Sequence, residues 1–170
     1  DEANDVENTS KAAFAQATYE LTDSLSATFG LRHTEDEKTY RPTHVTLGVA
    51  PLILLIDEKT VEFSDTSPRF SVDYRWSDEV FTYFSYSEGF KSGGFQGSAA
   101  SGLAASKPFD PETASQFELG AKAEWMDNRL RLNAAVFSTD YKDLQILQLL
   151  IPIGAPEGLS GVLVTQNASD

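Results

Sequence analysis

Apolar and polar side chains alternate with a period of two along most of the chain. The clearest case is the segment 70–76, in which apolar residues at every second position are separated by Ser71, Asp73 and Arg75. Alternation of this kind places one face of an extended strand in apolar surroundings and the other face in water. The pattern predicts strands over residues 13–21, 25–34, 70–76, 80–90, 116–125 and 130–139. In 80–90 both parities carry aromatic rings, so the pattern leaves the orientation of that strand open.

The connections between these strands differ systematically in length. Three short polar segments have the composition of turns that close hairpins: 22–24, 77–79 and 127–129. They alternate with three long stretches, at about 37–65, 92–112 and 145–161. We therefore predict that the short turns lie at one end of an antiparallel meander and the long connections at the other. Outer-membrane barrels have this asymmetry, and strands of about 10 residues are long enough to cross a bilayer.

A soluble β-sandwich is the main alternative, because alternation also describes a sheet whose apolar face packs on a second sheet. Such a module would bind carbohydrate through exposed rings such as Trp76 or Trp125. We favour the barrel because the predicted strands are longer than the usual length of about five or six residues. They also carry aromatic rings near the short-turn end. Burial separates the two hypotheses. A barrel leaves the following residues exposed, and a sandwich buries them: Phe70, Val72, Tyr74, Leu119, Ala121, Leu130 and Leu132.

Composition narrows the possible functions. The 170 residues carry a formal charge of −13 and contain no cysteine. Nucleic acid is excluded as the main partner, because binding its phosphates requires a basic surface. The absence of cysteine excludes disulfide scaffolds, cysteine-bound zinc and thiol catalysis. The most apolar run, 49–56, contains Pro51 and is far too short to form a transmembrane helix. Its Leu52–Ile56 core does not fit a solvated loop, and the sequence gives no firmer account of it.

No motif in the sequence points convincingly to catalysis or to a bound metal. The glycine-rich segment 89–97 lacks the Gly-Lys-Ser/Thr ending of a phosphate-binding loop and follows a strand without opening a helix. His33 and His44 fall in a strand and a loop, so we expect solvated side chains rather than metal ligands. Asp110 and Glu112 flank a proline, where we expect them to order the start of a strand. We therefore expect no enzyme activity, no cofactor and no metal site.

The order of several short motifs resembles one family of membrane proteins. The strongest piece is 83–95, which reads Tyr-Phe-Ser-Tyr-Ser-Glu-Gly-Phe-Lys-Ser-Gly-Gly-Phe. The other pieces lie before and after it, at 14–34, 67–76, 109–112, 118–122, 129–133 and 137–145. In this order and at this spacing, over residues 13–145, they resemble the β-barrel of TonB-dependent outer-membrane receptors. Gln166 to Ala168 resemble the beginning of the next strand.

The resemblance implies an all-β fold in which residues 1–170 are a fragment of a barrel of about 22 antiparallel strands with a plugged lumen. About six to seven strands are present, and this sequence contains no plug. The connections at 37–65, 92–112 and 145–161 then face the cell exterior. Because a membrane barrel must close, we expect the isolated fragment to be unstable or prone to aggregation.

The resemblance also implies a function. The family takes up scarce solutes across the bacterial outer membrane, and a ferric siderophore or a similar iron complex is the expected cargo. The expected partners are the TonB energy-coupling complex, reached through the absent plug, outer-membrane lipid and lipopolysaccharide, and the solute itself. The barrel then supplies a wall and no chemistry of its own.

Two sets of candidate site residues follow. The positions expected to contact solute lie in or next to the long connections: Tyr40, Arg41, Phe90, Lys91, Phe95 and Gln96. The positions expected to face the lumen and contact the plug are charged residues of the polar parity: Glu20, Arg32, Asp73, Arg75, Glu118, Lys122 and Arg131. The polar parity is assigned to the lumen because an Arg or Lys facing lipid near the midplane costs about 2–4 kcal/mol.

Overall fold

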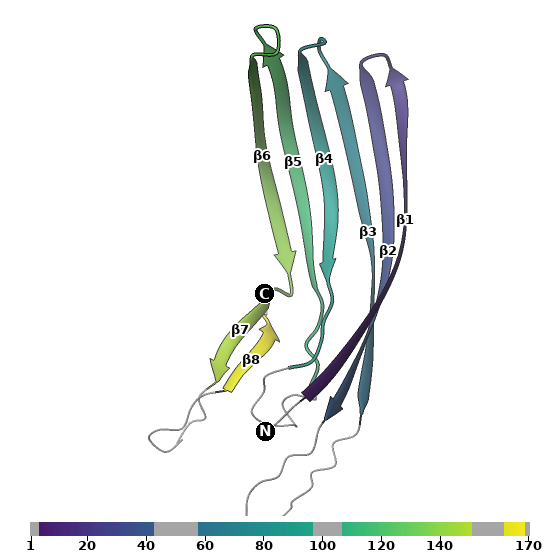
Figure 1. Ribbon diagram of the computed structural model, residues 1–170, viewed down its shortest axis with the longest axis vertical. Helices are drawn as coiled ribbons and strands as arrows, with labels where there is room; N and C mark the ends of the chain where they lie inside the picture. Colours follow the sequence, from purple (N-terminus) through teal and green to yellow (C-terminus); the bar gives the residue numbers. More distant parts are fainter. Residues whose placement is uncertain (1–3, 43–57, 97–106, 151–161, 169–170) are drawn as a thin grey trace, which may run out of the picture.

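A computed structural model describes residues 4–42, 58–96, 107–150 and 162–168. The strands are β1 (Asn4–Thr22), β2 (Leu25–Pro42), β3 (Lys59–Arg75), β4 (Val80–Lys91), β5 (Glu112–Trp125), β6 (Leu130–Lys142), β7 (Gln145–Leu150) and β8 (Val162–Asn167). Six of them form one antiparallel sheet in the order β1-β2-β3-β4-β5-β6, and β7 pairs with β8 in a separate hairpin beyond the end of β6 (Figure 1). The described residues contain no helix that is long and apolar enough to span a membrane.

The connections lie as the sequence predicts. The turns between β1 and β2, β3 and β4, and β5 and β6 are all at one end of the sheet, and the long connections leave from the opposite end (Figure 1). Met126, Asp127 and Asn128 in the last turn have positive φ angles of 58°, 53° and 63°, a region that asparagine and aspartate tolerate better than most residues. The predicted asymmetry of short turns and long connections is therefore confirmed.

Three strands extend further toward the long-connection end than the alternation indicated. β1 begins at Asn4, β2 continues to Pro42 and β3 begins at Lys59, so 37–65 is wrong as the bounds of the first long connection. Here both faces carry polar side chains, and pairs such as the Thr39 and Thr60 hydroxyls, 2.9 Å apart, join the strands. The parity that is apolar in 25–31 becomes polar from His33 to Arg41, so the alternation ends and the sequence pattern missed this extension. The apolar run 52–56 lies outside the described residues.

The end of the chain also differs from the prediction. The stretch 145–161 was predicted as a loop, but its first residues form β7. β8 pairs with β7, and the ladder continues past it because the Ala168 amide donates to the Leu144 carbonyl at 2.8 Å. Gln166 and Asn167, expected to begin a strand, are instead the last two residues of β8, which begins at Val162. The remaining connection, 92–112, agrees with the observed end of β4 at Lys91 and start of β5 at Glu112.

Register divides the sheet into two faces, because directly paired residues of antiparallel strands lie on the same side. Phe84 pairs with Val72 and with Leu119, which assigns it to the apolar face. Tyr83 pairs with Asp73 and Gly120, which assigns it to the polar face. The orientation of β4, left open by the sequence, is thereby fixed, and on its polar side β4 carries two aromatic rings, those of Phe81 and Tyr83.

The apolar face of the sheet is exposed. Phe70 is 39% exposed, Tyr74 38%, Leu119 55%, Leu130 44% and Leu132 52%, and Ala121 is also exposed. Val72 is half-buried between its neighbours on the same sheet. No second sheet covers this face among the described residues, because the six strands form one sheet and the other two form a small hairpin. The sandwich hypothesis is therefore wrong, and the burial expected of a barrel wall is confirmed.

The apolar positions form a belt of limited height. In β5 they extend from Phe117 to Trp125, and toward the long-connection end they give way to the paired residues Ser115 and Asp140. A run of roughly nine residues is about 30 Å of strand. A strand tilt of about 40° reduces this to about 23 Å, close to the apolar band of about 25 Å in outer-membrane barrels.

Two neighbouring alanines of β6 test which face meets lipid. Ala134 pairs with Ala121 on the apolar face, and Ala135 pairs with Gly120 on the polar face. In a receptor containing this chain and reconstituted in bilayers, we expect Ala134→Arg to lower the free energy of unfolding by about 2–4 kcal/mol. Ala135→Arg is the matched control and should change it by less than about 1 kcal/mol, because its guanidinium reaches water. Urea titration measures both, and equal losses would contradict the assignment of the faces.

Candidate functional site

The polar face brings together the seven residues predicted to face the lumen. Glu20 pairs with Ser26, which in turn pairs with Asp73, and the same parity continues across the sheet to Glu118 and Lys122. Arg32, Arg75 and Arg131 share that parity. These seven side chains therefore lie on one face. A shallow groove of about 420 Å³ lies over β3, β4 and β5 on this face.

A hydrogen-bonded network centred on Tyr83 lies in this groove. The Tyr83 hydroxyl donates to Glu118 Oε1 at 2.5 Å, and the Gln116 amide donates to Glu118 Oε2 at 3.1 Å. Gln116 Oε1 in turn accepts from the Thr139 hydroxyl at 3.1 Å. The Lys122 ammonium lies 5.6 Å from the centre of the Tyr83 ring, within the range of a cation–π contact. Both oxygens of Glu118 thus have donors, one from β4 and one from its own strand, β5.

The Tyr83 ring adopts this position because its partner on β5 is a glycine. A Cβ on Gly120 would overlap the Tyr83 ring and hydroxyl. With only hydrogen at that position, the ring lies flat across the neighbouring strand and its hydroxyl reaches Glu118. Aromatic coverage of a strand glycine stabilises the pairing of the two strands. Nearer the short turns, Arg131 and Glu124 form a cross-strand ion pair at 2.6 Å on the same face.

Two of the six residues predicted to contact solute pack against each other. The rings of Tyr40 in β2 and Phe95 after β4 are 5.5 Å apart between centroids. Tyr40 is fully buried and Phe95 is 7% exposed, with Val6 and Val61 packed against them. The sequence pattern placed these rings in separate loops, and it contained nothing that would have paired them.

The other four candidates also have contacts within the chain. Arg41 in β2 binds Glu7 at 2.6 Å, Glu58 at 3.2 Å and Asp5 at 3.9 Å. Hydrogen bonds with Glu7 and then Glu58 raise the pKa of the Arg41 guanidinium above its ordinary value. Lys91 lies 3.5 Å from Glu112, and Phe90 is half-buried in β4. The structure therefore does not gather all six candidates around one site.

Gln96, the last candidate, belongs to a cluster of side-chain amides at the long-connection end. Its Oε1 accepts from the Thr165 amide at 2.7 Å, and its Nε2 donates to the Thr165 carbonyl. The Gln145 amide group donates to the carbonyls of Ser92 and Asp110 at 3.1 and 3.0 Å. These bonds join the segment after β4 and the start of β5 to the β7–β8 hairpin.

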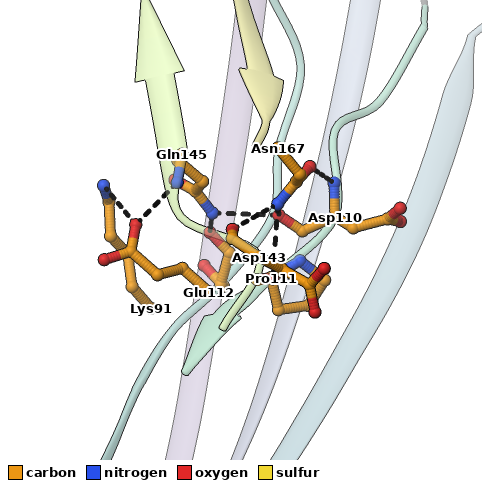
Figure 2. Close-up of polar contacts among 8 residues, drawn as sticks. Lys91, Asp110, Pro111, Glu112, Asp143, Gln145 and Asn167 are labelled. Atoms are coloured by element: carbon orange, nitrogen blue, oxygen red, sulfur yellow. Dashed lines mark hydrogen bonds and ion pairs between the residues drawn. The ribbon is translucent and has the colours of Figure 1, made fainter. Parts of the chain in front are cut away.

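Asn167 makes four hydrogen bonds in the same cluster (Figure 2). Its Oδ1 accepts from the Asp110 amide at 2.8 Å, and its Nδ2 donates to the carbonyls of Asp110, Pro111 and Asp143 at 2.9, 3.4 and 2.8 Å. Glu112 Oε2 accepts from the backbone N–H of Gln145 at 2.9 Å and lies 3.5 Å from the Lys91 ammonium, so it orders the start of β5 as predicted (Figure 2). Gln145 and Asn167 were not among the predicted site residues, because an amide that bonds to distant backbone leaves no local pattern in the sequence.

No group of three or more His, Cys, Asp or Glu side chains in the described part of the chain has an arrangement that would hold a metal ion. His33 instead shares a hydrogen bond of 2.8 Å with the Thr66 hydroxyl and lies 3.5 Å from Glu35, with more than half of its side chain exposed.

Gly120 offers a test of the network on the polar face. We expect Gly120→Ala to push the Tyr83 ring away from Glu118 and to lower the free energy of unfolding by about 1–3 kcal/mol, the usual cost of overpacking. Gly89→Ala in β4 is the matched control, because a Cβ there has nothing within 4 Å. It should change the free energy by less than about 0.5 kcal/mol. Equal effects of the two substitutions in bilayer-embedded receptor would contradict the close approach at Gly120.

Asn167 offers a test of the amide cluster. Asn167→Ala removes the acceptor of the Asp110 amide and three bonds to carbonyls, so we expect the local opening free energy of residues 108–112 to fall by about 1–3 kcal/mol. Hydrogen exchange of the Asp110 amide measures this as a rate increase of about fivefold to about 150-fold. Gln148→Ala, on the exposed side of the same hairpin, is the control and should leave the rate unchanged. Equal acceleration in both variants would show that Asn167 does not hold the cluster.

Comparison with known proteins identifies the class. The family described as "TonB dependent receptor-like, beta-barrel" matches residues 1–170. The chain belongs to this family, and its six-stranded sheet is part of an outer-membrane β-barrel that is not closed within these residues.

The similar proteins are receptors. The chain is 29% identical over 135 residues to the pesticin receptor of Yersinia pestis, an alignment that covers 79% of this chain and 19% of that protein. It is 28% identical over 132 residues to the ferric-pyoverdine 358 receptor of Pseudomonas putida, covering 78% of this chain and 15% of that protein. The chain thus spans about a fifth of the length of the curated relatives it matches.

Solved structures show the same arrangement of strands. The ferric yersiniabactin uptake receptor FyuA of Yersinia pestis superposes with a TM-score of 0.72 at 27% identity, over 84% of this chain and 22% of that one. The alcaligin outer-membrane receptor FauA of Bordetella pertussis superposes with a TM-score of 0.60 at 21% identity, over 95% of this chain and 26% of that one. At that identity the second likeness shows the fold alone.

Proposed function

We propose that the protein containing this chain is an outer-membrane receptor that takes up a ferric siderophore or a similar iron complex. The observation that carries the proposal is the match of the whole chain to the TonB-dependent receptor family. It is supported by similar proteins whose names refer to ferric pyoverdine and ferric yersiniabactin. The described strands form a barrel wall, and catalysis has no part in the proposal.

The polar face is the side that we assign to the lumen. Its charges are of both signs, and several are already joined across strands, as in the Arg131–Glu124 pair and the network around Tyr83. A surface of this kind suits contact with a hydrated protein domain better than contact with lipid. We therefore propose that Glu20, Arg32, Asp73, Arg75, Glu118, Lys122 and Arg131 face the plug domain of the complete receptor.

The end of the sheet from which the long connections leave, here called the rim, is the side that we assign to the cell exterior. Arg41 and Lys91 keep side chains that are 45% and 63% exposed, and we propose that they contact anionic groups of the solute. Tyr40, Phe90, Phe95 and Gln96 are packed or bonded within the chain, and we propose that they shape the rim next to the solute. The TonB complex, outer-membrane lipid and lipopolysaccharide are the proposed partners of the complete protein.

Uptake of radioactive iron tests the proposal. Cells that lack other iron receptors and express the complete receptor are given ferric yersiniabactin, and in parallel ferric pyoverdine, ferric alcaligin and a ferric catecholate. We expect energy-dependent accumulation of at least one complex, at a rate at least tenfold above cells without the receptor. The control is the same strain without a functional TonB complex, in which accumulation should be lost. Absence of uptake for all four complexes, or uptake that continues without the TonB complex, would overturn the proposal.

A further inference from the structure

Residues 92–96, which follow β4, connect two parts of the rim that the six-stranded sheet keeps apart. Phe95 packs on Tyr40 in β2, and the next residue, Gln96, binds the backbone of Thr165 in β8. We propose that residues 92–96 are a strap between two parts of the structure. One is the extension, meaning the ends of β1, β2 and β3 near the long connections, and the other is the β7–β8 hairpin. The strap opens at its Gln96 end. The functional part of this inference rests on the proposed uptake function.

The Phe95 end of the strap is a fixed anchor. Phe95 and the fully buried Tyr40 lie on the polar face of the extension, where Val6 and Val61 pack against them. Releasing this end would expose two large rings to water, which is costly because burial of apolar area is the main source of stability. Gly94 adds two backbone hydrogen bonds with Phe109, at 3.2 and 2.9 Å. A Cβ on Gly93 would overlap the Phe109 carbonyl, so the chain fits here only with a glycine.

The Gln96 end is held differently. Its attachment to β8 consists of hydrogen bonds between one side-chain amide and the amide and carbonyl of Thr165. Gln96 is half-buried, so water can take the place of either partner. A hydrogen bond that exchanges with water contributes little net free energy, whereas the buried rings have no such replacement. The strap therefore has one permanent end and one that releases.

The hairpin on the releasing side is attached mainly through side-chain hydrogen bonds. The β7–β8 ladder is separate from the ladder of β6, and Asp143, at the junction, has a φ of 54°. Side-chain amides of Gln96, Gln145 and Asn167 provide most of the described contacts between the hairpin and the segments before β5. When the Gln96 bonds break, β8 loses its link to the strap, and the Gln145–Ser92 bond still holds the start of β7 to the beginning of the strap.

A cavity of about 460 Å³ gives this release a consequence for uptake. Residues 107–110 line one side of the cavity, and residues 164–167 of β8 line the other. Gln96 also contributes to the lining. Asn167 stays bonded to Asp110, so separation of Gln96 from Thr165 widens this cavity on the Gln96 side. A solute that enters the rim next to β8 then needs an open strap, and an immobilised strap blocks its passage.

A reversible cross-link tests the strap in the complete receptor. Gln96→Cys and Thr165→Cys are combined and joined by a short bifunctional methanethiosulfonate. The control joins Ser115→Cys to Asp140→Cys, a directly paired position of β5 and β6 that the strap does not touch. We expect the 96–165 cross-link to reduce uptake of the transported ferric complex at least tenfold, with recovery on reduction, and the control to stay within twofold of the unmodified receptor. Uptake at the control rate with residues 96 and 165 joined would overturn the strap.

Hydrogen exchange gives a second readout that needs no transport. The Thr165 amide, bound to Gln96, should exchange at least tenfold faster than the Gly94 and Phe109 amides at the anchored end. Gln96→Leu should accelerate exchange at Thr165 and leave Gly94 unchanged. Equal exchange at both ends, or no effect of Gln96→Leu on Thr165, would overturn the strap. A receptor that transports none of the four ferric complexes would contradict the proposed function, and the exchange rates would still decide whether the strap opens at Gln96.

Discussion

Backbone hydrogen bonding between neighbouring strands is the constraint on which the rest of this structure depends. The hydrocarbon of a membrane offers no water to an unpaired amide or carbonyl. Each backbone group left without a partner there costs about several kcal/mol. Within the apolar belt, every interior strand of the six-stranded sheet is paired on both sides, and β1 and β6 are the edge strands of the described sheet. Because the ladders hold the strands together, neither face has to pack on another layer. The two faces are then free to meet different surroundings.

That freedom explains how much of the fold could be predicted from the sequence. Phe70, Val72 and Tyr74 alternate with polar residues because lipid and lumen impose opposite demands on adjacent positions, and the strand was correctly assigned from this contrast. Above the belt, both faces of β2 carry polar side chains, as at Lys38 and Thr39, and the contrast that reveals a strand is lost. The orientation of β4 was hidden for a related reason. Tyr83 is aromatic but lies on the polar face, where Gly120 makes room for its ring.

The rim could be predicted least, because its contacts are made by groups that have no periodicity. Asn167 and Gln145 bind carbonyls of segments more than 30 residues away in sequence. Beyond the ends of the strands, backbone amides and carbonyls would lack hydrogen-bond partners. A side-chain amide that lies beside them takes the place of the missing strand. Glu112 was singled out from the sequence because it follows a proline at the start of a strand, whereas its bond to the Gln145 amide depends on tertiary structure alone. Pairing of Tyr40 with Phe95 likewise required the segment after β4 to fold back on β2.

The direction of the two edge strands has a consequence for how such walls grow. β1 runs toward the short turns and β6 runs away from them, so the six strands begin and end on the same side of the membrane (Figure 1). A hairpin added beside either edge would continue the antiparallel order and return the chain to that side. A wall built from such units changes its circumference in steps of two strands, and the side on which later segments emerge stays the same. Duplication or loss of one hairpin would therefore resize the pore without inverting any connection that follows it.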